Sequence, residues 1–253
     1  MGTLAGKTAI VTGAGQGIGQ GIARALAREG AAVAALGRSM DKLEATCEQL
    51  RELGGEAVPL RCDVTDTDAV PGVVEEAVAA LGGLDVLVNN AYHGSFGPLL
   101  SMSDEKFQRG FRSGPFASFA FMKACHPHLA ARGGGDIINL LTSAMVRWDL
   151  TNYAAYASAK TALRTLTRAA ATEWGPDGIR VNGIAPHARS PGYAGWEAAN
   201  PEQAERFRAT IPLGYVGDCE QDIGRAVVML LGPDARYLTG ATIPLDGGQA
   251  NFD

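Results

Sequence analysis

Tyr156 and Lys160 are the two residues whose types and spacing point most directly to chemistry. They stand four positions apart in residues 152–174, a run whose composition predicts a long helix, so their side chains project from one face. A free tyrosine has a pKa of about 10 and exchanges protons poorly at neutral pH. A fixed positive charge beside the phenol favours the phenolate and lowers that pKa. The spacing therefore predicts an acid–base pair, although two unrelated residues on one helix face would have the same spacing.

A glycine-rich loop precedes this pair in the chain. Residues 12–19 directly follow an apolar, strand-like run and open a predicted helix, and Gly13, Gly17 and Gly19 give the spacing TGxxxGxG instead of GxGxxG. Glycines in such a turn let the backbone approach a pyrophosphate, and the helix N-terminus stabilises its negative charge. A tight structural turn is the alternative, but the position between the first strand and the first helix favours nucleotide binding.

Both features need a scaffold, and the hydrophobic pattern predicts one. Apolar runs of strand length alternate with helical patterns along the chain. The predicted strands are residues 7–12, 32–36, 57–61, 86–89, 136–141, 180–184 and 241–245, and the predicted helices are 18–29, 41–53, 67–81, 103–131 with a break or kink at Pro115, 152–174 and 222–231. Strands that are apolar throughout and joined by helices form a parallel sheet covered on both faces. The predicted fold class is therefore α/β, a doubly wound parallel sheet with right-handed crossovers.

Residues 187–218 depart from this alternation. No linker rich in proline, glycine or serine divides the chain, so residues 1–253 are predicted to form one domain. Within it, residues 187–218 contain no clean strand and carry four aromatic residues, Tyr193, Trp196, Phe207 and Tyr215. A long aromatic insertion near the end of such a fold predicts a lid over a substrate.

The composition restricts the partners and the compartment. The net charge of −5 and the pI near 5.4 argue against nucleic acid or an anionic membrane as a main partner. No apolar run approaches the ~20 residues that span a bilayer, and residues 1–7 contain no signal core, so a cytoplasmic protein is expected. The four cysteines form no CxxC pair, and the HxH of residues 126–128 has no accompanying carboxylate or cysteine cluster. Neither a disulfide nor a metal site is predicted.

The motifs occur in a characteristic order. The TGxxxGxG loop, Asn89-Asn90-Ala91 after the fourth predicted strand, and YxxxK in a later helix together resemble the short-chain dehydrogenase/reductase family. The resemblance covers essentially the whole chain and includes shorter motifs at residues 62–64, 180–186, 238–240 and 246–248. It implies a seven-stranded Rossmann-like sheet, a nicotinamide cofactor, and a homotetramer, or a dimer, built through the long helices.

The end of the second strand bears on the choice of cofactor. In the family, an acid there binds the ribose 2′-hydroxyl of NAD(H), whereas a basic residue just after it binds the 2′-phosphate of NADP(H). Gly37 stands at the acid's position and Arg38 follows, which favours NADP(H). Gln16 stands where many NADP(H)-dependent relatives carry a second basic residue, so NAD(H) is the alternative. The resemblance assigns cofactor binding to Gly13, Gln16, Gly17, Ile18, Gly19, Arg38, Asp63, Val64, Asn90, Tyr156 and Lys160.

The resemblance also assigns catalytic roles. Tyr156 is expected to give its proton to a carbonyl oxygen during reduction or to take it during oxidation. Lys160 is expected to lower the pKa of Tyr156 and to bind the nicotinamide ribose. In the family, a serine after the fifth strand holds the substrate oxygen. Ser143 lies thirteen residues before Tyr156, the usual interval, whereas counting forward from Asn139 favours Thr142. Ser143 is the preferred candidate and Thr142 the fallback.

Three positions depart from the family pattern. Gly114 stands where a helix asparagine usually anchors a water of the proton relay, Tyr92 replaces the glycine after Asn-Asn-Ala, and His187 replaces the glycine after Ala-Pro. Glycine has no side chain to hold that water, although Ser113 or backbone carbonyls could do so. Tyr92 and His187 either shape the substrate or cofactor site or are loop residues tolerated by local rearrangement.

The sequence leaves three functions open. The leading hypothesis is an NADP(H)-dependent oxidoreductase that interconverts a carbonyl and a secondary alcohol of a small-molecule substrate. A 3-oxoacyl thioester reductase is the alternative within that class, because Arg132 and Arg168 could meet an acidic carrier protein. The rival from another class is a relative that has lost efficient chemistry and binds nucleotide or a partner. Gly114 motivates this rival, and the Tyr156–Lys160 pair argues against it.

Overall fold

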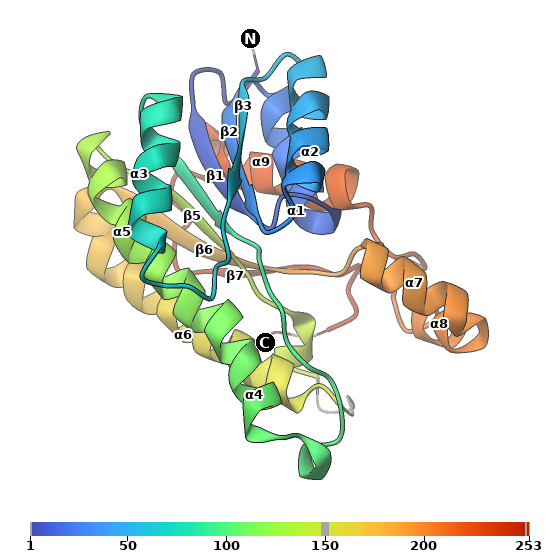
Figure 1. The fold of residues 1–253 in the computed structure, drawn as a ribbon. Helices are drawn as coiled ribbons and strands as arrows, with labels where there is room; N and C mark the ends of the chain where they lie inside the picture. The colour runs from blue at the N-terminus through green and yellow to red at the C-terminus, as the bar shows by residue number, and fades with distance from the viewer. Residues whose placement is uncertain (1, 148–151, 251, 253) are drawn as a thin grey trace.

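Seven parallel strands form one sheet in the part of the chain that the structure describes, in the order β3-β2-β1-β4-β5-β6-β7 (Figure 1). The structure is a computed structural model, and it describes residues 2–147, 152–250 and 252. The strands are β1 (Thr8–Thr12), β2 (Ala32–Gly37), β3 (Ala57–Arg61), β4 (Val86–Asn89), β5 (Gly135–Leu140), β6 (Ile179–Pro186) and β7 (Thr242–Leu245). All seven predicted strands are present, and their ends differ from the predicted ones by at most two residues.

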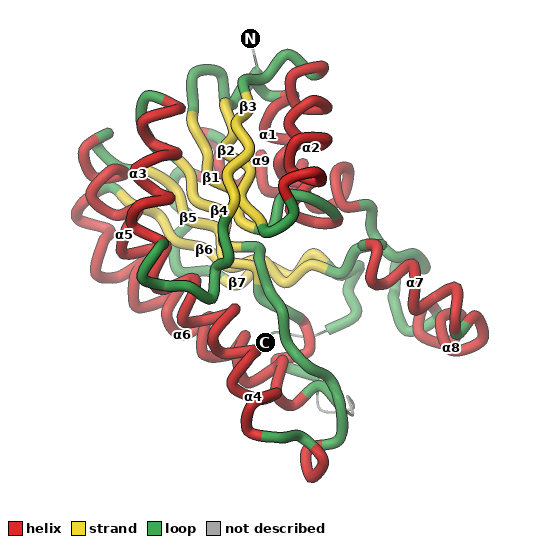
Figure 2. The backbone as a smooth tube through the Cα atoms, viewed as in Figure 1, coloured by secondary structure: helices red, strands yellow, loops and turns green. Residues whose placement is uncertain are grey.

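Helices cover both faces of the sheet, as predicted (Figures 1 and 2). On one face lie α1 (Gly17–Arg28), α2 (Met40–Glu52) and α9 (Arg225–Leu231), and on the other lie α3 (Val70–Leu81), α5 (Ala117–Ala131) and α6 (Ala154–Trp174). The strands serve both layers because alternate residues point to opposite faces. In β1, Ala9 and Val11 belong to the first core, whereas Ile10 belongs to the second. The predicted doubly wound α/β fold is confirmed.

The strand order reverses at β1, which pairs with β2 on one side and with β4 on the other. In a doubly wound sheet the connections leave such a point in opposite directions and open a crevice at the carboxyl ends of the strands. Thr12 ends β1 and Asn89 ends β4, so the glycine loop and the loop after β4 meet there. This crevice is where the fold positions the candidate site.

A π-helical turn replaces the predicted break at Pro115. The chain runs from α4 (Asp104–Phe111) through η2 (Arg112–Phe116) directly into α5. The hydroxyl of Ser103 caps α4 by accepting a hydrogen bond from the Lys106 N–H at 3.3 Å. Proline lacks the N–H that an α-helix needs, and the wider turn admits it without ending the helix.

The predicted lid segment is helical. It contains α7 (Pro191–Ala199) and α8 (Pro201–Arg208), which project beyond the edge of the sheet (Figure 1). Each begins with a proline, which suits the first helical position. A second π-helical turn, η5 (Cys219–Gly224), then leads into α9. No helix in the described ranges combines the length and the apolar character needed to cross a membrane.

Candidate active site

A cleft of about 750 Å³ opens at the crevice, between the glycine loop and the loop after β4. Segments that follow five different strands contribute to its wall. The structure brings together here eight of the predicted cofactor-binding residues, namely Gly13, Gln16, Gly17, Ile18, Arg38, Asp63, Val64 and Asn90. Because these residues come from positions as far apart as 13 and 90, the sheet edge is what assembles them.

Asn90 ties the loop after β4 to the glycine loop. Its Nδ2 donates to the carbonyl oxygens of Thr12 at 2.8 Å and Gly13 at 3.2 Å. The hydroxyl of Thr12 accepts from the N–H groups of Asn90 and Ala91, both at 3.0 Å. A Cβ on Gly19 would lie 2.4 Å from Asn90 Nδ2, so only glycine allows this approach. The absence of a side chain at Gly19 therefore allows Asn90 to pack against the start of α1.

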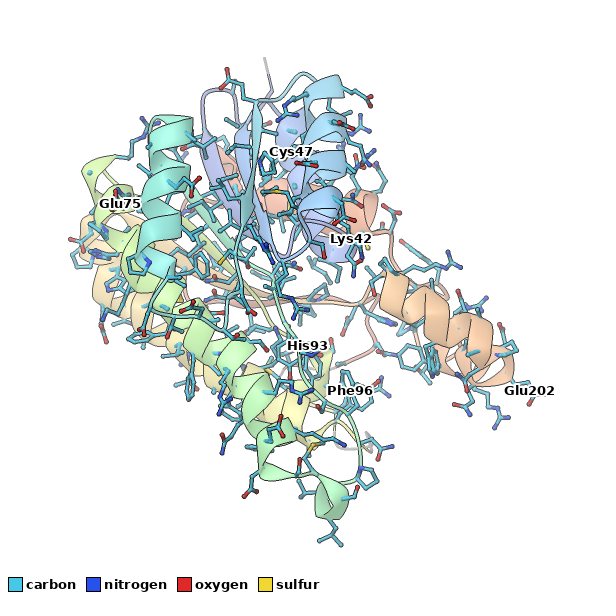
Figure 3. All side chains as sticks on the ribbon, viewed as in Figure 1. Lys42, Cys47, Glu75, His93, Phe96 and Glu202 are labelled. Atoms are coloured by element: carbon cyan, nitrogen blue, oxygen red, sulfur yellow. The ribbon has the colours of Figure 1, made fainter. Side chains whose placement is uncertain are left out.

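Arg38 and Lys42 line the cleft beyond the end of β2. Lys42 Nζ donates to Gln16 Oε1 at 2.8 Å, which joins the start of α2 to the glycine loop (Figure 3). The sequence reasoning missed Lys42. Its position in the first turn of the helix that follows β2, shortly after Arg38, was the signal that could have identified it.

Asp63 follows β3 and faces the same cleft. Its Oδ1 accepts hydrogen bonds from the Thr65 N–H at 3.0 Å and from the Thr65 hydroxyl at 2.8 Å. These bonds hold the pKa of Asp63 below its usual value because they stabilise the ionised carboxylate. Asp63 is thus fixed in orientation and charged at neutral pH.

Helix α6 carries Tyr156 and Lys160 one turn apart. Lys160 Nζ donates to the Leu140 carbonyl oxygen at 2.5 Å, and only 3% of the Lys160 surface is exposed. Burial lowers the pKa of Lys160 to about 7, because the charged ammonium loses its hydration. Burial also raises the pKa of Tyr156, although a hydrogen bond from the Thr142 hydroxyl acts in the opposite direction. The expected lowering of the Tyr156 pKa is therefore not what the structure gives, because desolvation of the phenolate outweighs the other effects.

Thr142 and Ser143 follow β5 and point to different partners. The Thr142 hydroxyl contacts Tyr156 and also accepts from the Ala144 N–H at 3.2 Å. The Ser143 hydroxyl donates to the carboxylate of Asp246 instead. The Thr142 hydroxyl thus contacts the phenol, while the role of Ser143, the preferred candidate, stays a prediction. The counts from Asn139 and from Tyr156 differ by one residue because the connecting loop can accommodate an added residue.

Comparisons with known proteins agree with this arrangement. A family model described as enoyl-(acyl carrier protein) reductase matches residues 13–250. A 12alpha-hydroxysteroid dehydrogenase of a Clostridium species is 40% identical over 256 residues, which cover 98% of both chains. The chain belongs to the short-chain dehydrogenase/reductase family. The resemblance identified from its motifs is confirmed.

Solved structures of other short-chain dehydrogenase/reductases share the fold. A 7alpha-hydroxysteroid dehydrogenase complexed with NADH and 7-oxo glycochenodeoxycholic acid is 33% identical, with a TM-score of 0.91 over 98% of this chain and 95% of that one. A protein of Beutenbergia cavernae, described as an NAD(P)-dependent gluconate 5-dehydrogenase with bound NADP, is 35% identical, with a TM-score of 0.90 over 97% of both chains. This short-chain dehydrogenase/reductase is an NAD(P)-dependent enzyme that acts on alcohol and carbonyl groups.

Aromatic rings surround the phenol of Tyr156 in this short-chain dehydrogenase/reductase. The ring of Tyr92 lies edge-on to Tyr156 with 5.0 Å between centroids, and it occupies the space beside Gly114. The ring of Phe96 lies 5.4 Å from Tyr156 and is 58% exposed. Tyr153 packs against Phe96 at 5.1 Å. These rings form an apolar wall beside Tyr156 that the motifs did not reveal.

His187 lies at the base of the predicted lid. Its ring packs edge-on against Phe207 at 4.9 Å and Tyr193 at 5.6 Å, and its backbone N–H donates to the Leu245 carbonyl oxygen at 2.9 Å. Burial lowers the pKa of His187, which keeps the imidazole neutral. His187 thus joins the aromatic cluster of α7 and α8 to the end of β7.

The predicted carrier-protein arginines lie apart from the cleft. Arg132 Nη2 donates to Asp85 Oδ2 at 3.1 Å, and the same oxygen accepts from the Thr8 N–H at 3.0 Å. Thr8 begins β1, so Arg132 lies at the opposite edge of the sheet from the cleft. Arg168 is exposed on α6.

His126 and His128 have separate partners. His126 Nε2 lies 3.0 Å from Asp177, and His128 Nε2 lies 2.9 Å from Glu75 on α3 (Figure 3). Among the residues with described positions, no three histidine, cysteine, aspartate or glutamate side chains are grouped to hold a metal ion. The two histidines therefore act as links between helix α5 and its neighbours.

Proposed function

We propose that this enzyme transfers a hydride between NADP(H) and the carbonyl or secondary alcohol of a ring-bearing substrate, with Tyr156 as the general acid–base group. The observation that carries the proposal is the position of the Tyr156 phenol. It contacts the Thr142 hydroxyl and the Tyr92 ring, and Tyr92 in turn lines the cleft. A proton donor beside a hydroxyl that can hold a substrate oxygen is the arrangement that carbonyl reduction requires.

The cleft fits a nicotinamide dinucleotide. Gly13 and Gly17 have φ of +68° and +60°, so the loop at the start of α1 turns without side chains and leaves its N–H groups accessible to a pyrophosphate. Asp63 and Val64 would contact the adenine, and Lys160 would bind the nicotinamide ribose. When bound, the cofactor supplies or accepts the hydride.

The side chains of α6 and β5 manage the proton. In reduction, Tyr156 gives its proton to the carbonyl oxygen, and its raised pKa keeps it protonated at neutral pH. In oxidation, Tyr156 takes the hydroxyl proton, and a charged Lys160 favours the phenolate that this requires. Thr142 holds the substrate oxygen through its hydroxyl, and Ser143 is the second candidate for this role. In this proposal Tyr156 transfers the proton and the cofactor transfers the hydride.

Arg38 and Lys42 support NADP(H) over NAD(H). Both line the cleft beyond β2, and residues 37–40 contain no carboxylate that would bind a ribose 2′-hydroxyl. A guanidinium pairs with phosphate through two parallel hydrogen bonds, and an ammonium adds a point charge. Lys42 supplies the second basic residue that Gln16 does not.

A fused-ring substrate such as a steroid suits the substrate side. The rings of Tyr92, Phe96 and Tyr153 offer an apolar surface next to Tyr156. Residues 187–218 would close over the substrate as a lid, with Trp196 on the same aromatic cluster as His187. The relative with 40% identity is named for dehydrogenation of a steroid hydroxyl, which supports the same class.

A substrate panel tests this proposal. Hydroxysteroids and oxosteroids, small ketones and a 3-oxoacyl thioester are assayed with both cofactors, using the wild type and Tyr156→Phe. We expect steroid turnover by the wild type and a loss of about 10³-fold in kcat/KM for Tyr156→Phe. Turnover of the thioester alone would favour the alternative activity. Cofactor binding without any Tyr156-dependent turnover would favour the rival binding protein.

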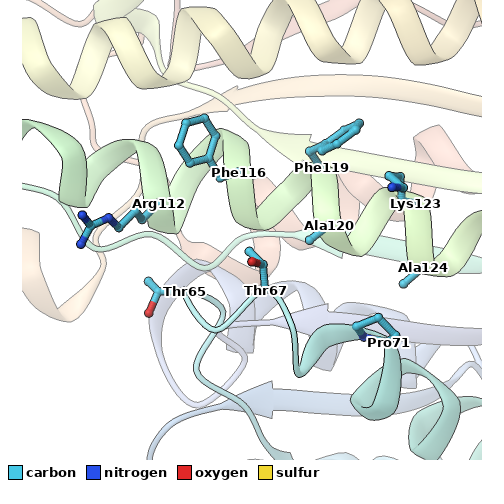
Figure 4. A pocket seen from close by; sticks show the side chains of 9 residues that line it. All are labelled: Thr65, Thr67, Pro71, Arg112, Phe116, Phe119, Ala120, Lys123 and Ala124. Carbon is cyan, nitrogen blue, oxygen red and sulfur yellow. The ribbon is translucent and has the colours of Figure 1, made fainter.

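We also propose a homotetramer, or a dimer, built through α5 and α6. Helix α5 exposes 46% of Phe119, and Phe116 just before it is 57% exposed. Both rings border a cavity of about 670 Å³ between α5 and the loop before α3 (Figure 4). Light scattering of the wild type and of Phe119→Glu tests this proposal. A wild type with the mass of one chain would contradict it.

A further inference from the structure

The ring of Tyr92 contacts both members of the Tyr156–Lys160 pair. We propose that Tyr92 is a positioning residue for catalysis, whose ring face holds the ammonium group of Lys160 beside Tyr156. This inference rests on the proposed function, because it assumes that Tyr156 and Lys160 perform the proton transfer.

The contacts of Lys160 support this role. Lys160 Nζ lies 4.8 Å from the centroid of the Tyr92 ring, compared with 6.0 Å from that of Tyr156. A cation within about 6 Å of a ring centroid is attracted by the negative face of the ring, and the attraction is stronger when both are desolvated. Among the described residues, no carboxylate forms an ion pair with Lys160, and its hydrogen bond goes to the Leu140 carbonyl oxygen. The Tyr92 ring is therefore a main source of stabilisation for the positive charge.

Three glycines make room for the ring. A Cβ at Gly94 would lie 2.1 Å from the Tyr92 hydroxyl oxygen, and one at Gly110 would lie 2.7 Å from it. A Cβ at Gly114 would lie 3.4 Å from Cε2 of the same ring. None of these glycines has a positive φ, so the backbone itself does not demand glycine at these positions. The ring demands glycine at Gly94 and Gly110, whereas a Cβ at Gly114 would make an ordinary van der Waals contact with it. Residues from α4, η2 and the loop after β4 therefore pack around the ring.

Hydrogen bonds hold the loop that carries Tyr92 against η2. The Ser113 hydroxyl donates to the His93 carbonyl oxygen at 2.8 Å and accepts from the His93 N–H at 3.0 Å. Ser113 is buried, so these bonds are shielded from water. The residue next to Tyr92 is thus anchored, and the ring has a fixed position between η2 and α6.

Tyr92 itself remains neutral. Burial raises the pKa of Tyr92, and proximity to Tyr156 raises it further. Tyr153, which precedes α6, is a further titratable group near the pair, and Thr142 and the Leu140 carbonyl contribute uncharged oxygens from the end of β5. Tyr92 therefore offers a π face and no competing charge. Its effect is to favour the ammonium form of Lys160 against burial, and through it the phenolate of Tyr156.

Two variants at position 92 separate a ring effect from a packing effect. Tyr92→Phe keeps the π face, whereas Tyr92→Leu fills the space without one. The measurement is the pH profile of kcat for alcohol oxidation. We expect the midpoint of the ascending limb of the kcat profile to lie within about 0.3 pH unit of the wild-type midpoint for Tyr92→Phe, and about one pH unit above it for Tyr92→Leu. At a pH below both midpoints, kcat of Tyr92→Leu would then be about tenfold lower than that of the wild type.

A second measurement keeps this inference distinct from the proposed function. Ultraviolet titration of each variant against its Tyr156→Phe counterpart reports the pKa of Tyr156 without turnover. An unchanged rate in Tyr156→Phe would reject the proposed acid–base role, while the titration would still decide whether position 92 controls the pKa. Identical profiles for Tyr92→Phe and Tyr92→Leu, or equal shifts in both, would overturn the inference. If Tyr92→Leu does not fold, Tyr92→Met serves as the variant without a ring.

Discussion

The two ends of the active-site cleft use glycine for different reasons. At the cofactor end, Gly13 and Gly17 have positive φ, so the backbone turn itself requires glycine. At the substrate end, Gly94 and Gly110 have ordinary φ, and a side chain at either position would collide with the ring of Tyr92. Glycines that a backbone turn requires stand close together and form a short motif. Glycines that one side chain requires stand far apart in the sequence and form no motif.

The two ends also differ in their hydrogen-bond partners, which are mostly backbone atoms at one end and side chains at the other. At the cofactor end, Asn90 and Thr12 bind mostly backbone atoms, so their partners are fixed by the strands. At the substrate end, side chains face other side chains, as in the contact of Thr142 with Tyr156 and of Ser143 with Asp246. We therefore expect the cofactor end to respond to substitution through stability and binding, and the substrate end through catalysis.

After Tyr156→Phe, the largest loss of activity is expected from the removal of the Thr142 hydroxyl, and Ser143→Ala is the comparison. Thr142→Val removes the hydroxyl beside Tyr156 and should lower kcat by about 10²-fold or more, because a donor to the substrate oxygen is lost. Ser143→Ala should lower kcat less than tenfold and instead destabilise the fold by about 1–3 kcal/mol, because the buried Asp246 loses a partner. Kinetics and urea unfolding of both variants provide the test. A larger loss of kcat in Ser143→Ala would restore Ser143 as the substrate-binding hydroxyl.

Gly19→Ala tests whether the close approach of α1 to Asn90 requires glycine. Its Cβ would meet Asn90 Nδ2 at 2.4 Å, so we expect the free energy of unfolding to fall by about 2 kcal/mol. Gly72→Ala is the matched control, because it lies in α3 with no atom within 4 Å of the added Cβ. That control should be neutral or slightly stabilising. Chemical denaturation of both variants measures the difference, and equal stabilities would show that α1 adjusts freely.

Arg38→Ala tests whether the cofactor end selects its ligand by charge. Loss of a charge-assisted pair with a 2′-phosphate should raise the KM for NADP(H) about tenfold and leave that for NAD(H) unchanged. Arg206→Ala, on the exposed surface of α8, is the control. Steady-state kinetics with both cofactors decide the outcome. A wild type that prefers NAD(H), with no change in Arg38→Ala, would reject the NADP(H) assignment.

Phe96→Leu should have the smallest effect and bears on the substrate end. Loss of the exposed ring next to Tyr156 should raise the KM for a ring-bearing substrate by a factor of about 3 and leave kcat unchanged. Leu100→Ala, on the same loop but fully exposed, should change neither parameter. A fall in kcat without a change in KM would show that Phe96 orients Tyr156 instead of contacting the substrate.

The fold class, the positions of the seven strands and the family could be predicted from the amino-acid sequence. So could eight of the residues that line the cleft. Strands that are apolar on both faces have one stable arrangement between helices, and a turn that needs positive φ must carry glycine. An apolar strand and a glycine turn can each be recognised from a few consecutive residues, so both can be predicted from the sequence. Even the helical disturbance at Pro115 could be predicted, because it follows from one missing N–H.

The contacts around Tyr156 could not be predicted from the sequence. The interval to Tyr156 favoured Ser143 and the count from Asn139 favoured Thr142, because loop length does not fix which of two adjacent hydroxyls faces α6. In the fold, the Thr142 hydroxyl contacts Tyr156 and the Ser143 hydroxyl donates to Asp246. The sequence showed Tyr92 and Gly114 as separate departures, and packing reveals them as neighbours. Contacts between segments depend on the shape and direction of side chains that are distant along the chain. For that reason the motifs locate Tyr156 and Lys160 in the sequence, whereas their contacts with other side chains follow from the packing.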